Sequence, residues 1–356
     1  MSENKLFAYH PGEYISDALD AMNMSQNEFA LRTGISEKNL STLINGKSDI
    51  TFELAEKLAS FFHNSIDFWT NLQNRYDSFL KQEEKEKELK ENWEIVRLFD
   101  KDFLSEVCNI KYDPKNKEEI IDKLRESFMV GSLSYLKRED MFAFLKTNIS
   151  RKSTEKEIIL RNAWVSLAMK IANGQSCREY DAEKLMLLIP ELKRMTRMTP
   201  EEFTPLLRQK LAEAGIKYVE LPYLKSSNVR GVTKWIPNEK CIVVAVNDCG
   251  KVADKIWFTI FHELGHAIKN HKRHMTISNG YADDPDEQEA NRFAENSLID
   301  PEHFKEFISQ KRFDLPAISD FAEKEGIGES IVIGRLEKEG ILEYGTYNKY
   351  KKRYGI

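Results

Sequence analysis

The stretch "FTIFHELGHAIKNH", from Phe258 to His271, decides how the rest of the chain is interpreted. It contains the five residues His262-Glu263-Leu264-Gly265-His266, which fit the pattern H-E-x-x-H. Each residue of an α-helix turns the chain by ~100°, so positions four apart project from one face, one turn from each other. The apolar flanks predict a helix in a hydrophobic core, where two histidines and a glutamate need polar partners.

A metal ion is a partner that suits this helical face. Two imidazoles one turn apart, from His262 and His266, reach a single tetrahedral zinc ion at ~2.0–2.1 Å. Glu263 is rotated away from both, so it is placed to take a proton from a water activated by the metal without binding the metal itself. The alternative is a helix whose two histidines are satisfied by ordinary hydrogen bonds.

A catalytic zinc site needs a third protein ligand, and the segment "PDEQEANRFAENSLIDP" offers two glutamates. Glu287 and Glu289 are two residues apart on a predicted helix, so only one of them faces the metal. Asn291 shares the face of Glu287 at i+4, where a polar side chain supports a ligating histidine. We therefore predict Glu287 as the ligand and Asn291 as its support. Glu289 is the alternative ligand, and an exposed acidic helix start is the alternative to both.

The motif H-E-L-G-H followed by E-x-E-A-N-x-F-A resembles the ImmA/IrrE family of intracellular metallopeptidases, over about residues 200 to 340. The resemblance implies that His262, His266 and Glu287 bind Zn²⁺ and that Glu263 is the general base. It also implies a zincin-like fold in which a small sheet precedes the helix. The segments "KYVELPYL", "VRGVTKW" and "KCIVVAVND" favour strands of such a sheet, which we expect to be antiparallel.

Three further features lie near or beyond this motif. The side chains of His271, His274 and Tyr281 are candidates for stabilising a reaction intermediate, although an ordinary surface position is the better explanation for each of them. The stretch "ISDFAEKEGIGESIVIGRLEKEGIL" resembles the pair of C-terminal helices found in the same family. The basic end of the chain, "YGTYNKYKKRYGI", predicts a solvated terminus, with contact to nucleic acid or an acidic partner as the alternative.

The N-terminal part carries a different signal, in the stretch from Met24 to Phe62. Ser25 and Ser36 fit the caps of two short helices, and Gly34 fits the turn between them. Two such helices around a glycine turn form a helix-turn-helix. Residues 9 to 77 resemble the HigA-like, phage-repressor type of this fold.

In a helix-turn-helix the start of the second helix meets base edges, and flanking residues meet phosphates. The residues predicted to contact DNA in this way are Gln26, Lys38, Asn39, Ser41, Thr42 and Lys47. Residues 1–77 nevertheless contain six Lys or Arg and eleven Asp or Glu, whereas basic groups supply most DNA affinity. The alternative is a dimerisation or partner-docking module.

The whole chain is therefore expected to be mainly α with a small α+β part. We expect a helix-turn-helix bundle over residues 1–77, a helical middle region over 78–200, and a zincin-like metallopeptidase domain with a small antiparallel sheet and a C-terminal helical pair over 201–356. The charged run from Leu80 to Val96 predicts a solvated connecting helix.

Composition narrows the function classes further. The net charge of −5 argues against a protein that coats nucleic acid. No apolar run approaches the ~20 residues that span a bilayer, and the N-terminus lacks the apolar core of a signal peptide. The four cysteines form no C-x-x-C pair. These observations favour the cytoplasm and argue against a membrane partner.

The resemblance implies a cytoplasmic zinc-dependent endopeptidase coupled to a DNA-binding regulator. Its partners would be DNA and a specific regulatory protein, a repressor or antitoxin, which it would cleave in stress response, mobile-element control or toxin–antitoxin control. The first part of the chain would place it at DNA or pair it as a homodimer. The alternative is a non-catalytic DNA-binding repressor or antitoxin that uses the peptidase fold as a sensor or docking domain.

Overall fold

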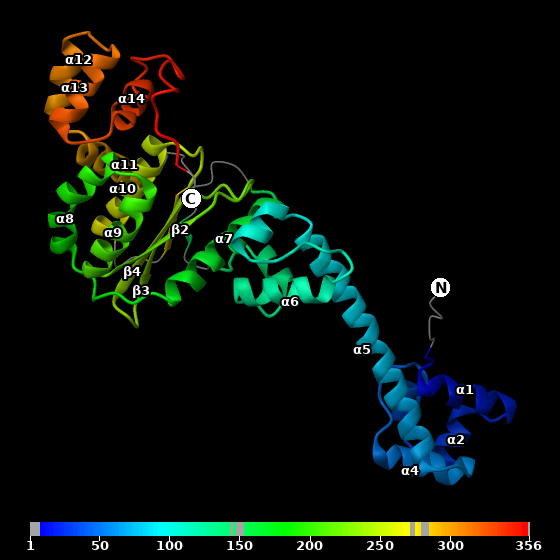
Figure 1. Cartoon of the computed structure of the whole chain (residues 1–356). Helices are drawn as coiled ribbons and strands as arrows, with labels where there is room; N and C mark the ends of the chain where they lie inside the picture. Colours follow the sequence, from blue (N-terminus) through cyan, green and yellow to red (C-terminus); the bar gives the residue numbers. More distant parts are fainter. Residues whose placement is uncertain (1–7, 143–144, 147–152, 271–274, 279–284, 355–356) are drawn as a thin grey trace. The chain divides into compact units, whose positions relative to one another are not determined.

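The computed structural model describes residues 8–142, 145–146, 153–270, 275–278 and 285–354 (Figure 1). The chain divides into two compact units, Met1–Glu91 and Asn92–Ile356. The boundaries predicted at residues 77/78 and 200/201 fall inside helix α5 (Ile66–Val96) and at the start of helix α9 (Pro200–Glu213). Among the described helices, none has the length and apolar character needed to cross a membrane.

Unit 1 is a bundle of helices around a small apolar core. Its members are α1 (Pro11–Ala21), α2 (Gln26–Thr33), α3 (Glu37–Ile44), α4 (Phe52–Phe62) and the first turns of α5. Ser25 Oγ accepts a hydrogen bond from the Glu28 amide at 3.2 Å, and Ser36 Oγ accepts one from the Asn39 amide at 3.2 Å. These caps start α2 and α3, and Gly34 ends α2 in the left-handed region with φ +66°. The core includes Ile15, Phe29, Leu40, Leu43, Leu58 and Trp69.

Helix α1 is held against α3 by two residues of the sequence "HPGEY". The buried His10 caps α1, because its Nδ1 accepts a hydrogen bond from the Gly12 amide at 2.9 Å. Gly12 lies against the end of α3, where an added Cβ would be 2.0 Å from the Leu43 carbonyl oxygen. The motif therefore has a structural role in closing the bundle.

The first part of unit 2 is helical. It contains the turns η1 (Phe103–Val107) and η2 (Leu133–Lys137) and the helices α6 (Lys117–Phe128) and α7 (Glu155–Asn173). Helix α7 is buried along most of its length and packs on both α6 and the sheet strand β2. The indole of Trp164 donates a hydrogen bond to the Pro222 carbonyl at 3.1 Å. The middle region is thus fixed to the C-terminal part of the chain.

The sheet of unit 2 has five strands in the order β1-β5-β3-β4-β2. Strand β3 pairs antiparallel with β4, as the sequence predicted, and it also pairs antiparallel with β5, a strand that the sequence analysis did not predict. The prediction of an antiparallel sheet is wrong for the other pairs, since β2 is parallel to β4 and β1 is parallel to β5. The tight β3–β4 hairpin returns β4 beside β2 in the same direction, which makes the sheet mixed. The strands are β1 (Leu145–Lys146), β2 (Ile216–Leu221), β3 (Gly231–Ile236), β4 (Cys241–Asn247) and β5 (Met275–Ser278).

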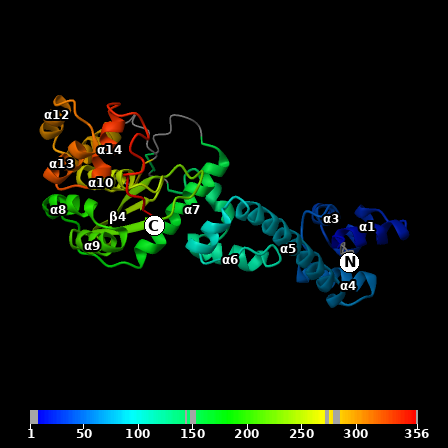
Figure 2. The same ribbon diagram turned by 45° about the horizontal axis from the view of Figure 1, so that its top comes forward.

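Helices α8 (Ala182–Arg194), α9, α10 (Ala253–Asn270) and α11 (Pro285–Leu298) share one hydrophobic core with one face of this sheet, and Figure 2 shows α8, α9 and α10 beside β4. The central helix is α10, whose Trp257, Ile260 and Leu264 are fully buried in the same core as the β2 and β4 side chains. The last helices are α12 (Pro301–Ser309), α13 (Leu315–Glu325) and α14 (Glu329–Lys338). Helices α13 and α14 form the predicted C-terminal pair, and α14 packs directly on α10.

The prediction of a solvated terminus is wrong for Lys351 and Tyr354, which are buried, whereas Lys349, Lys352 and Arg353 are exposed. Lys351 is buried, and its Nζ lies 2.7 Å from Asp254 Oδ2 and 2.7 Å from Glu337 Oε2. The Ala253 amide also donates a hydrogen bond to the Lys352 carbonyl at 2.9 Å. The tail is therefore anchored to the first turn of α10 by a buried ion-pair network.

Candidate metal centre and helix-turn-helix surface

Close packing of two helices brings the predicted ligands together. His262 and His266 lie on α10, and Glu287 lies in the first turn of α11. Gly265 permits the contact, since a Cβ there would lie 3.2 Å from the Cα of Ala290 on α11. A larger residue would push the helices apart, so this glycine sets the distance between the histidines and the glutamate.

The three side chains converge on one point inside the protein. His262 Nε2 and His266 Nε2 are 3.0 Å apart. The Glu287 carboxylate lies 3.2 Å from His262 Nε2 through Oε2 and 3.1 Å from His266 Nε2 through Oε1. All three residues are buried. Among the described residues, these three form a group whose ligand atoms all lie within 4.8 Å of one another, close enough to bind one metal ion.

The donor set fits a metal ion of the zinc type. Ligand atoms held at ~2.0–2.1 Å around a tetrahedral ion lie ~3.3 Å from one another, close to the spacing found here. Two imidazoles and one carboxylate are the ligands of a catalytic zinc site that keeps its fourth position open. Three lone-pair atoms that converge in a buried site repel each other unless a cation or proton lies between them.

The same convergence shifts the pKa values of these groups in the metal-free state. Burial alone would raise the pKa of Glu287, but hydrogen bonds with His262 and His266 outweigh it and lower the pKa to about 2. Burial lowers the pKa of His266, yet the hydrogen bond to Glu287 and the charge of Glu263 leave that pKa above its ordinary value of 6.5. At pH values below this raised pKa, a proton on His266 thus takes the place of the cation in the metal-free protein.

Asn291 fixes the ring of His262. Its Oδ1 lies 2.9 Å from His262 Nδ1, one helical turn after Glu287 on α11. An amide oxygen accepts a hydrogen bond from Nδ1–H, so the proton of the neutral ring stays on Nδ1 and Nε2 is free to bind a metal. His266 Nδ1 has no hydrogen-bond partner among the described residues.

Glu263 points toward the sheet and is completely buried. Its Oε2 accepts a hydrogen bond from Thr233 Oγ1 at 2.6 Å, while Oε1 has no hydrogen-bond partner in the described part of the chain. Burial raises the pKa of this carboxyl, although His266, His262 and Thr233 act against it. Gly231 on β3 makes room for the side chain, because a Cβ there would be 2.3 Å from Oε1.

Two residues of the site were missed by sequence reasoning. Ser278 ends β5 and places its Oγ 3.1 Å from His262 Nε2, and Thr233 on β3 holds Glu263. Strands β3 and β5 pair so that Gly231 lies opposite Ser278. A hydroxyl residue in a short strand is a weak signal, so only the pairing of β3 and β5 reveals these contacts.

The other predicted alternatives lie elsewhere. Glu289 Oε1 forms an ion pair with Lys269 Nζ at 3.1 Å, on the outer side of the two helices. His271, His274 and Tyr281 fall outside the described residues. The geometry therefore assembles His262, His266, Glu287, Glu263 and Asn291, and it leaves Glu289 out.

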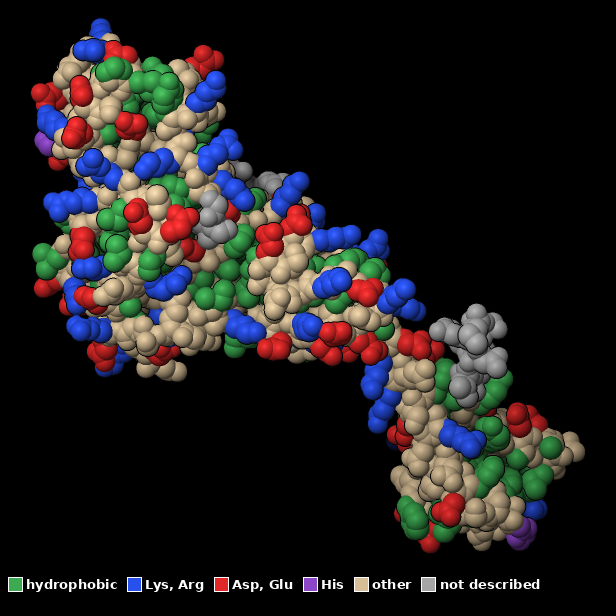
Figure 3. All heavy atoms as spheres, in the orientation of Figure 1, with side chains coloured by type: hydrophobic (Ala, Val, Ile, Leu, Met, Phe, Trp, Pro, Cys, Tyr) green, Lys and Arg blue, Asp and Glu red, His purple; other side chains and the backbone are tan. Residues whose placement is uncertain are grey.

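The residues predicted to contact DNA lie on one segment of unit 1. Gln26 begins α2, and Lys38, Asn39 and Ser41 are exposed on α3. Thr42 is half-buried, with its Oγ1 2.9 Å from the Asn39 carbonyl, and Lys47 is exposed just after α3. Basic side chains are sparse on the face of unit 1 seen in Figure 3.

The cations of unit 1 are not equivalent. Arg32 pairs with Glu28 at 2.5 Å, and Lys57 pairs with Glu53 at 3.0 Å. Lys38 and Lys47 form no ion pair with any described residue, so their charges are available to an anionic partner. Both flank α3.

Comparison with known proteins agrees with the division of the chain into a helix-turn-helix unit and a unit that contains the candidate metal centre. Residues 15–69 match the family model described as helix-turn-helix, and residues 212–337 match the model described as IrrE N-terminal-like domain, of the M78 peptidases. The chain carries a helix-turn-helix domain and an M78 peptidase-family domain. The helix-turn-helix domain spans α1 to the start of α5, and the M78 domain contains the whole candidate metal centre.

The individual relatives match the helix-turn-helix domain. The HTH-type transcriptional regulator YddM of Escherichia coli K12 is 39% identical over 66 residues, which are 18% of this chain and 70% of that protein. The virulence-associated protein A' of Dichelobacter nodosus is 39% identical over 69 residues, 19% of this chain and 60% of that protein. The chain thus spans 60 to 70% of the length of these relatives.

A solved structure is similar to the same region. It is an addiction module antidote protein of a HigA family from Coxiella burnetii, 31% identical, with a TM-score of 0.23 and coverage of 24% of this chain and 95% of that one. The two family matches and the relatives, taken together, describe a transcriptional-regulator type of helix-turn-helix joined to a peptidase-family domain.

Proposed function

We propose that this protein is a zinc-dependent endopeptidase that cleaves a specific regulatory protein, a repressor or antitoxin, and that its helix-turn-helix domain binds DNA. The observation that carries the enzymatic part is the buried triangle of His262 Nε2, His266 Nε2 and Glu287 beside Glu263. The match to the M78 peptidases supports the reaction class.

His262, His266 and Glu287 would hold the ion, with Asn291 orienting His262. When bound, zinc supplies a Lewis acid that polarises a peptide carbonyl and makes water easier to deprotonate. Glu263 takes the proton of the attacking water and delivers it to the leaving amine. Thr233 keeps the Glu263 carboxylate in place, because the 2.6 Å hydrogen bond restrains one oxygen and leaves the other unpaired for the water.

The test of the enzymatic part is Glu263→Gln in the full chain. We expect the variant to keep about one zinc ion per chain and to lose cleavage, because the amide cannot accept the proton. Protein abundances in cells that produce wild type or Glu263→Gln would identify the substrate as a protein lost only with wild type. Glu289→Gln, on the exposed side of α11, is the matched control and should retain cleavage.

The opposite outcome favours the non-catalytic alternative. If Glu263→Gln folds, keeps zinc and retains full regulatory activity, proteolysis is not the function. Zinc quantification on Glu287→Ala and Glu289→Ala tests the ligand set separately, and only the first is expected to lose the ion.

The DNA-binding part rests on the free cations Lys38 and Lys47 at the ends of α3. Neutralising either one should weaken binding uniformly across sequences and reduce the slope of log affinity against log salt by about 1. Lys57→Gln is the control, because Lys57 already pairs with Glu53. If Lys38→Gln and Lys47→Gln bind DNA as tightly as wild type at all salt concentrations, unit 1 acts instead as a dimerisation or docking module.

A further inference from the structure

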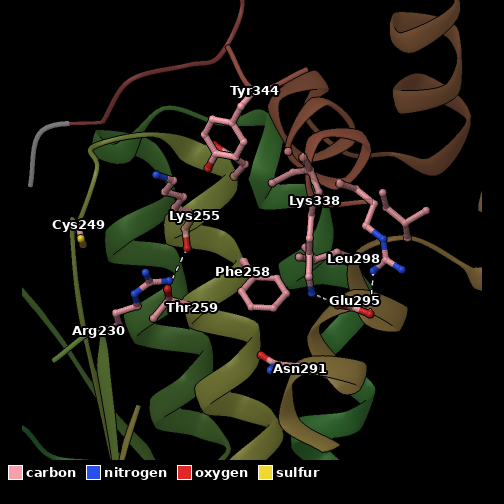
Figure 4. A pocket seen from close by; sticks show the side chains of 15 residues that line it. Arg230, Cys249, Lys255, Phe258, Thr259, Asn291, Glu295, Leu298, Lys338 and Tyr344 are labelled. Atoms are coloured by element: carbon pink, nitrogen blue, oxygen red, sulfur yellow. Dashed lines mark hydrogen bonds and ion pairs between the residues drawn. The ribbon is translucent and has the colours of Figure 1, made fainter. Parts of the chain in front are cut away.

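A cavity of about 430 Å³ lies next to the candidate metal centre (Figure 4). Its walls come from α10, α11, α14, the residue preceding β3 and the segment after α14. The volume falls within the range of ~300–1,000 Å³ that is usual for ligand sites. No part of the proposed cleavage chemistry uses this space.

The cavity is lined by the same two helices that form the metal centre, α10 and α11, at positions about one helical turn from the metal-site residues. On α10, Phe258 lies one turn before His262, and their ring centroids are 6.2 Å apart. On α11, Asn291 lines the cavity while contacting His262, and Glu295 follows one turn later. Four helical residues rise ~6 Å, so the cavity begins about that far from the metal ligands.

This distance suits a neighbouring residue of a bound peptide. An extended chain advances ~3.3–3.6 Å per residue. A side chain one or two positions from the bond being cleaved would therefore reach the cavity. Asn291, whose Oδ1 contacts His262, lines the cavity and so marks the side nearest the metal centre (Figure 4).

The charges of the lining favour an anion. Four cations line the cavity, Arg230, Lys255, Arg335 and Lys338, against the carboxylates of Asp254 and Glu295. Both carboxylates are already engaged. Glu295 pairs with Arg335 at 3.0 Å and with Lys338, and Asp254 pairs with Lys351 at 2.7 Å.

Two cations remain without an acidic partner within the described ranges. Arg230 and Lys255 are exposed and lie on the same wall of the cavity, opposite Lys338 (Figure 4). Between the walls lies the ring of Phe258, 5.1 Å from Lys338 Nζ. A ligand with a short apolar stem and a terminal carboxylate matches a surface with an aromatic floor and two free cations.

We propose that this cavity binds the acidic side chain, Asp or Glu, of a substrate residue within two positions of the cleaved bond, through Arg230 and Lys255. This inference rests on the proposed peptidase function and adds a sequence preference to it. The carboxylate is held by charge-assisted hydrogen bonds from the two cations, and its methylene stem packs on Phe258.

The first test is cleavage of a proteome-derived peptide library by the zinc-loaded full chain. We expect Asp and Glu to be enriched about tenfold or more at one position within two residues of the cut, since contacts to charged groups commonly discriminate by that factor. Lys255→Gln and Arg230→Gln should reduce the enrichment while peptides with Gln at that position are still cut. Lys255→Glu should shift the preference toward Lys and Arg.

The matched control is Lys269→Gln, since Lys269 is a half-exposed cation of α10 that pairs with Glu289 and does not line the cavity. It should leave the enrichment unchanged. Cleavage that depends on Glu263 but shows no acidic preference overturns the inference alone. Absence of any cleavage that depends on Glu263 overturns the proposed function, and the inference with it.

A second test does not depend on turnover. Fluorescent peptides from the library, each paired with its Glu-to-Gln isostere, are bound to the Glu263→Gln protein and followed by anisotropy. The acidic member should bind roughly tenfold more tightly, and Lys255→Gln should remove the difference. If free N-acetylglutamate binds at Lys255 as tightly as the acidic peptide, the occupant is a free anion, and the assignment to a substrate residue is overturned.

Discussion

Gly231 of β3 lies directly against the carboxylate of Glu263, with 2.3 Å between the position of an added Cβ and Oε1. Glu263 is fully buried, so its side chain cannot turn into solvent. A methyl group at position 231 must therefore displace the Glu263 carboxylate. Gly231→Ala is expected to reduce cleavage by about 100-fold, the usual cost of a misplacement of ~1 Å in an active site. Zinc content should stay near that of wild type, because the ligands come from α10 and α11.

Steady-state kinetics and metal analysis check this prediction on the same preparation. Gly131→Ala is the control, since a Cβ at that position meets only the Tyr135 ring at 3.6 Å. Full activity of Gly231→Ala would show that Glu263 is not the base.

Asn291 provides a second prediction, about metal affinity. Asn291→Ala removes the oxygen that lies 2.9 Å from His262 Nδ1 and leaves the ring free to turn. Loss of such a supporting group typically lowers metal affinity 10- to 100-fold. Competition with a fluorescent zinc chelator measures the change. Asn296→Ala, at an exposed position of the same helix, should bind zinc like wild type.

The protonation of the metal-free site predicts a pH dependence of zinc affinity. Zinc binds neutral imidazole, whereas Glu287 keeps a proton on His266 to a pH above 6.5. Below the raised pKa, each pH unit upward should therefore increase zinc affinity by about tenfold. Calorimetric titrations between pH 6 and 8.5 would test this, and a flat profile would contradict it.

The Glu287–His266 pair also predicts a pH dependence for the stability of the metal-free protein. Zinc affinity should rise with pH through the raised pKa of His266, whereas this stability should fall. The pKa of Glu287 is lowered to about 2, so its stabilising effect is present above pH 4.5 and is lost as the pH falls toward 2. The pKa of His266 is raised, so its effect is present below pH 6.5 and is lost as the pH rises through the raised value. Metal-free unit 2 should gain most from this pair between about pH 4.5 and 6.5. Thermal unfolding of the dialysed and the zinc-loaded protein, each measured across this pH range, tests the prediction. Only the dialysed form should show the extra stability between about pH 4.5 and 6.5.

Lys351 allows a prediction for stability. Lys351→Met leaves the Asp254 and Glu337 carboxylates buried without their cation, which typically costs about 3–5 kcal/mol. Lys349→Met changes an exposed lysine of the same tail and should cost little. Urea unfolding of the full chain, followed by tryptophan fluorescence, compares the two. Equal midpoints would mean that the tail is not anchored as described.

The glycines of unit 1 separate two physical effects. Gly12→Ala places a methyl group 2.0 Å from the Leu43 carbonyl oxygen and forces α1 away from α3. Gly34→Ala meets no atom within 4 Å and costs only the strain of a positive φ, about 1 kcal/mol. We expect the first variant to lower the melting temperature of unit 1 clearly more than the second. Calorimetry on the full chain resolves this, and the reverse order would refute the packing argument.

The sequence predicted the parts of the fold that depend on local chemistry. Ser25, Ser36 and Gly34 mark the helix-turn-helix because caps and left-handed turns require particular residue types. The histidines of α10 were found because an i,i+4 pair on an apolar helix has few ordinary uses. Asn291 followed from the same helical geometry, and the structure places it on His262.

The features that escaped prediction depend on contacts between distant segments. The sequence from Met275 to Ser278 does not indicate that Ser278 lies beside His262, because that contact exists only when β5 pairs with β3. The parallel β2–β4 pair depends on where the β3–β4 hairpin returns. The basic tail looked solvated because its two acidic partners lie 14 and 97 residues away in sequence.

The contact at Gly265 has a consequence for mutational tolerance within the H-E-x-x-H motif. Its two unspecified positions are constrained by different neighbours. Leu264 faces the apolar core, and Gly265 faces Ala290 and Phe293 of α11. A saturation library should therefore accept several aliphatic residues at 264 and almost only glycine at 265. In this chain the residue at position 265 of the motif is decided by its contact with α11, the helix that carries Glu287.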